Sequence, residues 1–156
     1  MTRREFVRSA GVAGLATLVA AAAPYQPPRS FVVSREERRI PGITRPLRLV
    51  FLTDLHLGPY LGERELQRWV DATLRREPDA VLLGGDLVDR NYRGDLAELA
   101  AHLPRLSAPL GVYAVLGNHD HARFPRLTPM LELLETSGVE LLVNSAVRVR
   151  DDLVLT

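Results

Sequence analysis

The chain alternates between short apolar runs and longer amphipathic segments. Residues 47–52 are apolar except for Arg48, a pattern typical of a buried strand. Residues 61–77 place apolar side chains on one helical face, and Pro78 ends that pattern. The same order continues and predicts strands at 80–83, 111–116 and 139–143, helices at 96–106 and 127–136, and a hairpin at 146–150 and 153–155. It indicates an α/β fold, β-α-β-α-β-α-β plus a C-terminal hairpin, in which the hairpin extends the sheet as an antiparallel or mixed part.

Single residues on these helices refine the prediction. Pro104 is expected to kink or shorten the helix at 96–106, and Gly138 is expected to stop the helix at 127–136. Trp69 lies on the apolar face of its helix, and His102 lies away from the polar clusters described below. Both are therefore expected to have structural roles.

Residues 1–23 have the pattern of a targeting segment. Arg3 and Arg4 precede Phe6, and a nearly uncharged run follows from Ala10 to Ala23. As a helix this run spans roughly 21 Å, which is short of the about 30 Å of a bilayer core. The segment resembles a twin-arginine export signal, which implies the twin-arginine export machinery as a partner and a location in the periplasm or on the outer face of the cytoplasmic membrane. An uncleaved membrane anchor or a frayed terminal helix is the alternative.

The remaining chain divides into a connector and a domain. Residues 24–46 are expected to be a Pro-rich connector with an edge strand that begins Phe31-Val32-Val33. Residues 47–156 hold the alternating strands and helices, and their length suits one domain.

Charge and composition exclude several kinds of function. The 20 basic and 19 acidic side chains give a net charge of +1, so no basic surface predicts nucleic-acid binding. The chain has no cysteine, which excludes disulfides, thiolate zinc sites and a cysteine nucleophile.

Polar side chains gather where three of the predicted strands end. Asp54 and His56 follow the first strand, Asp86 follows the second, and Asn118 and His119 follow the third. Asp86 lies 32 residues after Asp54 and 32 before Asn118, which is about the length of one βαβ crossover. Because the carboxyl ends of parallel strands meet at one edge of a sheet, these side chains are expected to converge there.

The side chains of these clusters suit divalent metal ions. Carboxylate, amide and imidazole ligands without sulfur fit manganese, iron, zinc or magnesium. Asp54 and His56, two residues apart, can share one ion, and the two oxygens of Asp86 can bridge two ions. Asn118 adds a neutral oxygen. Each cluster alone is also compatible with an ordinary turn, so the prediction rests on all three in this order.

The three clusters together resemble a known superfamily. Asp54-Leu55-His56, Gly85-Asp86-Leu87-Val88-Asp89 and Gly117-Asn118-His119-Asp120 are similar to the motifs of calcineurin-like metallophosphoesterases. With the export-type segment, the chain also resembles the YaeI-like exported phosphodiesterase branch. The resemblance implies a four-layer α-β-β-α sandwich with two divalent metal ions, manganese, iron or zinc, at the sheet edge.

The resemblance also implies roles for individual residues. Asp54 and His56 would bind the first metal, Asp86 would bridge both, and Asn118 would bind the second. A metal-bridging hydroxide would attack phosphorus, and His119, oriented by Asp120, would act near the leaving group.

Three further residues lie in or next to these motifs. Arg90 aligns with an arginine that contacts phosphate in some members, and a surface salt bridge is its alternative. Asp89 is expected to brace its loop by hydrogen bonds. His121 can line the substrate opening, although exposure to solvent is the favoured interpretation.

The family pattern continues beyond the motifs found here. Its later histidine and its Gly-His-X-His segment have no counterpart, because no histidine follows His121. We therefore expect the chain to be the N-terminal half of a longer phosphodiesterase, truncated at the C-terminus, and to have little or no activity alone. The alternative is a shortened, non-catalytic protein that binds a metal or a partner. Phosphoester small molecules and lipid headgroups both fit as substrates, the latter with peripheral membrane association.

Overall fold

The structure, a computed structural model, describes residues 31–59 and 61–156. The predicted export signal and the first part of the connector lie outside the described residues. The helices and strands follow in the order β1 (Leu49–Leu52), α2 (Glu63–Leu74), β2 (Ala80–Leu83), α3 (Ala97–His102), the 3₁₀ helix η1 (Leu103–Arg105), β3 (Val112–Ala114), α4 (Asn118–Arg123), α5 (Thr128–Thr136), β4 (Glu140–Leu141), β5 (Val147–Arg150) and β6 (Leu153–Leu155). In this part of the chain, no helix has the length and apolar character needed to cross a membrane.

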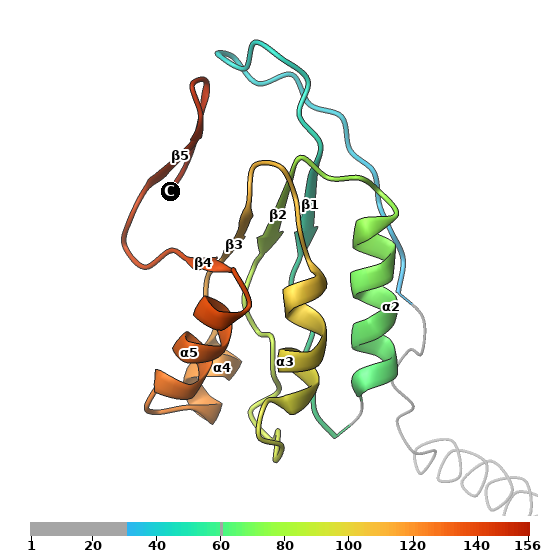
Figure 1. The fold of residues 1–156 in the computed structure, drawn as a ribbon, viewed down its shortest axis with the longest axis vertical. Coiled ribbons are helices and arrows are strands. Elements are labelled where there is room, and N and C mark those ends of the chain that lie inside the picture. Colours follow the sequence, from blue (N-terminus) through green and yellow to red (C-terminus); the bar gives the residue numbers. More distant parts are fainter. Residues whose placement is uncertain (1–30, 60) are drawn as a thin grey trace, which may run out of the picture.

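Four strands form one parallel sheet in the order β1-β2-β3-β4. Val50 pairs with Val81, which pairs with Val112, and Leu52, Leu83 and Ala114 are aligned in the same way. The helices lie in front of this sheet in Figure 1. The predicted α/β class and the parallel sheet are therefore confirmed, and they are consistent with the N-terminal half of a metallophosphoesterase fold.

The core joins the helices to the sheet. Almost fully buried helical side chains cluster with Val81 and Leu83 of β2, and these helical side chains are Leu66, Val70, Leu99, Met130 and Leu134. Burying one side chain of this size stabilises the fold by about 1.5–3 kcal/mol. In contrast, Leu49 and Phe51 of the edge strand β1 are 39% and 62% exposed. The apolar contacts of the sheet are thus concentrated on the side of the helices.

Two predicted helix ends agree with the structure. Helix α3 ends at His102, and the chain continues as a 3₁₀ turn that contains Pro104, because proline cannot donate the next helical hydrogen bond. Helix α5 ends before Gly138, whose φ of 70° is readily adopted only by glycine.

The predictions for the two ends of the described chain need correction. Residues 31–40 form no strand, although Phe31-Val32-Val33 predicted one. A strand needs a partner strand, and this segment is exposed along its length instead. The C-terminal hairpin β5–β6 is a separate two-stranded sheet and does not extend the main one. Between β4 and the hairpin, Asn144 has a left-handed backbone with a φ of 47°, and β5 then pairs only with β6.

A polar clasp holds this hairpin to the connector. Asp152 Oδ2 accepts hydrogen bonds from the main-chain nitrogen and the hydroxyl of Thr44, both at 2.7 Å. Arg150 pairs with the same carboxylate and donates to the carbonyl oxygens of Arg45 and Pro46. These contacts lower the pKa of Asp152, first through the Arg150 hydrogen bond and then through Thr44.

The clasp predicts a stability that depends on pH. A carboxylate with a lowered pKa in the folded state stabilises that state fully above its ordinary pKa of 3.8, and less as the pH falls below it. We expect Asp152→Asn to lower the unfolding temperature at pH 6, and this difference from wild type to shrink towards pH 2. Thermal unfolding at several pH values measures it, with the exposed neighbour Asp151→Asn as control. A difference that stays constant from pH 6 to pH 2 would contradict the assignment.

Candidate metal centre

The loops that follow β1 and β2 remain paired beyond the strands. The main-chain nitrogens of Asp54 and His56 donate to the carbonyl oxygens of Gly85 and Asp86, at 3.1 and 2.9 Å. Leu57 continues the pairing as an isolated parallel bridge to Val88. The side chains at these strand ends are therefore fixed by a continuous backbone ladder rather than carried on free loops.

Three of the predicted ligands have left-handed backbones. Asp54, His56 and Asp86 have φ values of 56°, 45° and 51°. This conformation costs a residue with a side chain roughly 1–2 kcal/mol. Such residues cluster at functional sites, where the surrounding structure holds them in place. The strain indicates that this edge of the sheet is shaped for these side chains to converge.

Two glycines allow the second and third loops to touch. At Gly85, with φ of 91°, a Cβ would lie 2.6 Å from the main-chain nitrogen of Gly117. At Gly117, a Cβ would lie 2.1 Å from Asp86 Oδ1. Only hydrogen fits at either place, so the carboxylate of Asp86 comes directly against the start of α4. There Asp86 Oδ1 accepts a hydrogen bond of 2.8 Å from the main-chain nitrogen of His119.

Asp120 has a different role from the one expected. It is fully buried, and its oxygens accept hydrogen bonds from the main-chain nitrogens of Gly117 (2.9 Å) and Val88 (3.1 Å). Burial raises the pKa of Asp120, and these two hydrogen bonds oppose the shift. Asp120 therefore joins the loop after β2 to the first turn of α4 and does not orient His119. Adjacent residues on a helix do not face each other, which is why this prediction is wrong.

The ring of His119 contacts Asp89 and Arg90 instead. Asp89 Oδ2 lies 3.4 Å from His119 Nδ1, while Asp89 Oδ1 accepts a hydrogen bond of 2.7 Å from the main-chain nitrogen of Asn91. That hydrogen bond is the main cause that lowers the pKa of Asp89. Asp89 thus braces its loop, as expected, and also places a negative charge beside His119.

Arg90 closes the other side of this ring. Its main-chain nitrogen lies 3.3 Å from His119 Nδ1, and its Nη2 lies 3.2 Å from His119 Nε2. Among residues 31–59 and 61–156, Arg90 forms no ion pair, so the surface salt bridge considered as its alternative is not present there. Its exposed guanidinium is available to an anion that approaches His119.

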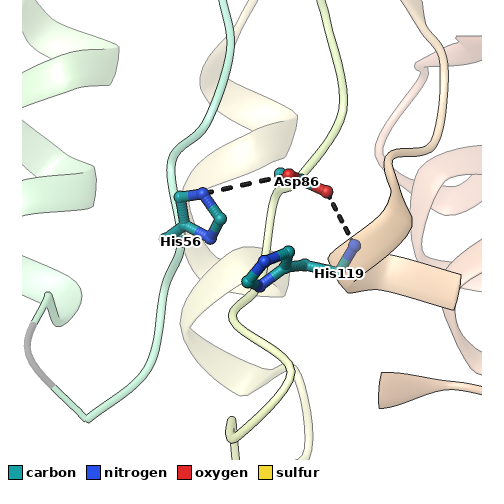
Figure 2. Close-up of side chains that lie close together, drawn as sticks. All are labelled: His56, Asp86 and His119. Carbon is teal, nitrogen blue, oxygen red and sulfur yellow. Dashed lines mark hydrogen bonds and ion pairs between the residues drawn. The ribbon is translucent and has the colours of Figure 1, made fainter. Parts of the chain in front are cut away.

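His56, Asp86 and His119 form a group that can hold a metal ion. Each offers one ligand atom, and these atoms lie within 4.8 Å of one another. Figure 2 shows the His56 ring directed at Asp86, with Nε2 and Oδ2 separated by 3.9 Å. Asp54 Oδ1 lies 3.6 Å from the same nitrogen. The rings of His56 and His119 meet edge to face, with centroids 4.4 Å apart.

The chemistry of this group fits a divalent cation. His56 Nδ1 is buried without a hydrogen-bond partner, a state that normally costs stability. Carboxylates of Asp54, Asp86 and Asp89 surround the two imidazoles, and a cation would reduce their mutual repulsion. Oxygen and nitrogen ligands together match the ions expected from the sequence.

Three other residues discussed from the sequence, Asn118, His121 and His102, lie outside this group. Asn118 begins α4 with an exposed side chain, directly before His119 in the sequence. His121 is exposed, as favoured. His102 is buried between α2 and η1, with Nε2 3.2 Å from Glu63 Oε1 and Nδ1 3.4 Å from Arg105 Nη1, which supports its structural role.

Known proteins match this chain over most of its length. A family described as calcineurin-like phosphoesterase matches residues 47–150. The "Transmembrane protein with metallophosphoesterase domain" of Danio rerio is 37% identical over 124 residues, which cover 80% of this chain and 28% of that protein. An "Uncharacterized metallophosphoesterase" of Aquifex aeolicus is 33% identical over 120 residues, which cover 77% and 44%.

A more distant match carries a more specific name. The "UDP-2,3-diacylglucosamine pyrophosphatase LpxG" of Chlamydia muridarum is 35% identical over 78 residues, which cover 50% of this chain and 24% of that protein. In all three comparisons the matched segment spans less than half of the relative.

Proposed function

This chain belongs to the calcineurin-like phosphoesterase family, and on that premise we propose that its strand-end site binds two divalent metal ions and serves the hydrolysis of a phosphodiester. The observation that carries the proposal is the convergence of His56, Asp86 and His119, whose ligand atoms lie within 4.8 Å. We propose Asp54, His56, Asp86 and Asn118 as the ligands of the ions, because Asp54 and Asn118 flank His56 and Asp86 at the same edge. His119 would face the substrate beside them.

The metal ions and Asp86 would have distinct roles in the hydrolysis. Divalent ions held here would activate water and neutralise charge that develops on the phosphoryl group. Asp86 would bridge the two ions, because His56 Nε2 lies near one of its carboxylate oxygens and the start of α4 lies near the other. This placement supports the bridging role that the resemblance implies.

His119 and Arg90 would act on the substrate itself. Asp89 Oδ2 faces Nδ1 of His119, and the main-chain N–H of Arg90 donates to the same nitrogen, so these contacts would orient the ring beside the leaving oxygen. Arg90 lies at Nε2 with an exposed guanidinium, where it can bind a phosphate oxygen. Together the two side chains would hold the phosphoryl group in place while its charge increases.

The substrate class and location extend the proposal further. The relative named as a diacylglucosamine pyrophosphatase supports a phosphoester joined to a lipid headgroup, beside soluble phosphodiesters. The N-terminal segment supports export by the twin-arginine route to the periplasm or the outer face of the cytoplasmic membrane. Membership in the YaeI-like branch remains a prediction.

Ligand binding tests this function directly in the 156-residue chain, from which we expect little or no turnover. We expect calorimetry to detect Mn²⁺ binding, and inorganic phosphate to bind only after Mn²⁺ is loaded. Arg90→Ala should weaken phosphate binding about tenfold or more, because a hydrogen bond between charged groups contributes about 1.5–3 kcal/mol. Mn²⁺ affinity should not change in this variant.

Other results would separate the alternatives. Mn²⁺ binding without any phosphate binding would favour the non-catalytic, metal-binding protein. Absence of Mn²⁺ binding would contradict the metal centre. Robust Mn²⁺-dependent hydrolysis of a generic phosphodiester would show that the ligands in this chain suffice for catalysis.

A further inference from the structure

A tyrosine outside the metal centre joins three elements around the loop that carries Asp89 and Arg90. Tyr92 follows these residues and is only 3% exposed. Its main-chain nitrogen donates to the carbonyl oxygen of Asp89 at 2.9 Å, which closes the turn through Arg90 and Asn91. The conformation of this turn therefore depends on where Tyr92 is held.

The carbonyl oxygen of Tyr92 is bound by α4. It accepts a hydrogen bond from Arg123 Nε, at the last residue of this helix. The guanidinium of Arg123 also lies over the ring of Phe124, 4.6 Å from its centroid, which restricts its movement. The first turn of α4 carries His119, and its last residue binds the turn that carries Arg90. One helix therefore positions both partners of the contact between His119 and Arg90.

The side chain of Tyr92 is bound by the start of α3. Its hydroxyl donates to Glu98 Oε2 at 2.5 Å and accepts from the main-chain nitrogen of Leu96 at 3.1 Å. Burial, then the Glu98 hydrogen bond, raises the pKa of Tyr92 to about 12, so the hydroxyl keeps its proton under ordinary conditions. The ring also lies over Gly94, where a Cβ would come within 2.3 Å of the hydroxyl oxygen.

We infer that Tyr92 is a positioning residue. Through its hydroxyl and through Arg123, it holds Asp89 and Arg90 in contact with the His119 ring. The inference rests on the proposed function, in which Arg90 binds phosphate beside His119. A phenylalanine would fill the same space, and a buried hydroxyl is costly unless it is bonded. The role that best explains the Tyr92 hydroxyl is therefore to fix the loop between β2 and α3.

The test compares Tyr92→Phe with Tyr113→Phe. Tyr113 is also buried, and its hydroxyl donates to the carbonyl oxygen of Leu110 at 2.7 Å, at the opposite end of β3 from the site. Loss of one hydrogen bond should speed amide exchange of Arg90 and Asn91 about tenfold in Tyr92→Phe. The NMR resonances of the His119 ring should also shift. Tyr113→Phe should change neither.

Phosphate binding extends the test to the proposed function. We expect Tyr92→Phe to weaken the binding of inorganic phosphate to the Mn²⁺-loaded chain about 3–10-fold at unchanged Mn²⁺ affinity. In an Arg90→Ala background it should have no further effect, because the two residues would act through one contact. Gly94→Ala, whose Cβ meets the Tyr92 ring, should reproduce the exchange result independently.

The two hypotheses fail in different ways. Exchange rates and His119 resonances that stay within twofold of wild type in both Tyr92→Phe and Gly94→Ala would overturn the positioning role. An additive loss of phosphate affinity in the double variant would do so as well. A wild-type chain that binds no phosphate would instead overturn the proposed function, and the exchange data would still decide whether Tyr92 holds the loop.

Discussion

Gly85→Ala is expected to destabilise the protein by about 2–5 kcal/mol. The φ of 91° at this position costs an alanine roughly 1–2 kcal/mol. The new Cβ would lie 2.6 Å from the main-chain nitrogen of Gly117, and relieving such an overlap with backbone costs typically another 1–3 kcal/mol. Because a domain has only about 5–15 kcal/mol of stability, urea unfolding should show this loss clearly.

Two other glycines separate these two causes. Gly138 has φ of 70° but no atom within 4 Å of an added Cβ, so Gly138→Ala should show the conformational cost alone, about 1 kcal/mol. Gly62 has neither feature, so Gly62→Ala should lose only the smaller preference for glycine at the N-cap of α2, about 0.5 kcal/mol. If Gly85→Ala costs no more than Gly138→Ala, the loops after β2 and β3 do not meet as closely as described.

Asp86→Asn is expected to weaken Mn²⁺ binding by about 100-fold or more. Replacing a partner of a ligand already costs about 10–100-fold in metal affinity, and Asp86 is itself the proposed bridging ligand. The amide can still accept the hydrogen bond that the main-chain nitrogen of His119 now donates to Oδ1. The fold should therefore survive, and calorimetric titration with Mn²⁺ measures the effect.

The stability of the same variant gives a second expected result. Without a metal ion, the carboxylates of Asp54, Asp86 and Asp89 lie around His56 with unfavourable charge repulsion. Removing one charge should leave the metal-free unfolding temperature unchanged or raise it. Asp71→Asn, on α2 far from the site and paired with Arg105, is the control and should not alter Mn²⁺ affinity. Equal Mn²⁺ affinity in Asp86→Asn and wild type would contradict the metal centre.

The parallel sheet could be predicted from the sequence because its signals are local. Each strand is a short apolar run, and each helix carries its own apolar face and its own stop, as at Pro104 and Gly138. The strand expected at Phe31 failed because three apolar residues do not provide a partner strand. The hairpin was predicted correctly as a pair of strands, but these strands pair only with each other and do not extend the main sheet.

The site could be predicted only as far as the strand ends converge. The equal spacing of Asp54, Asp86 and Asn118 indicates that their loops meet, because parallel strands end at one edge. Helix α4 was missed, since six residues form a helix here only with tertiary support from acceptors such as the Asp86 carboxylate. The contact between Asp89 and His119 depends on that helix and leaves no pattern in the sequence.

The clasp between the connector and the hairpin has a consequence for the order of folding. Thr44 and Asp152 are 108 residues apart, so this contact is among the most non-local in the described chain. At a synthesis rate of about 5–20 residues per second, Asp152 is synthesised roughly 5–20 seconds after Thr44. The βα core between these two residues can form during that interval. The connector can therefore be attached only after the βα core between the two residues has been synthesised.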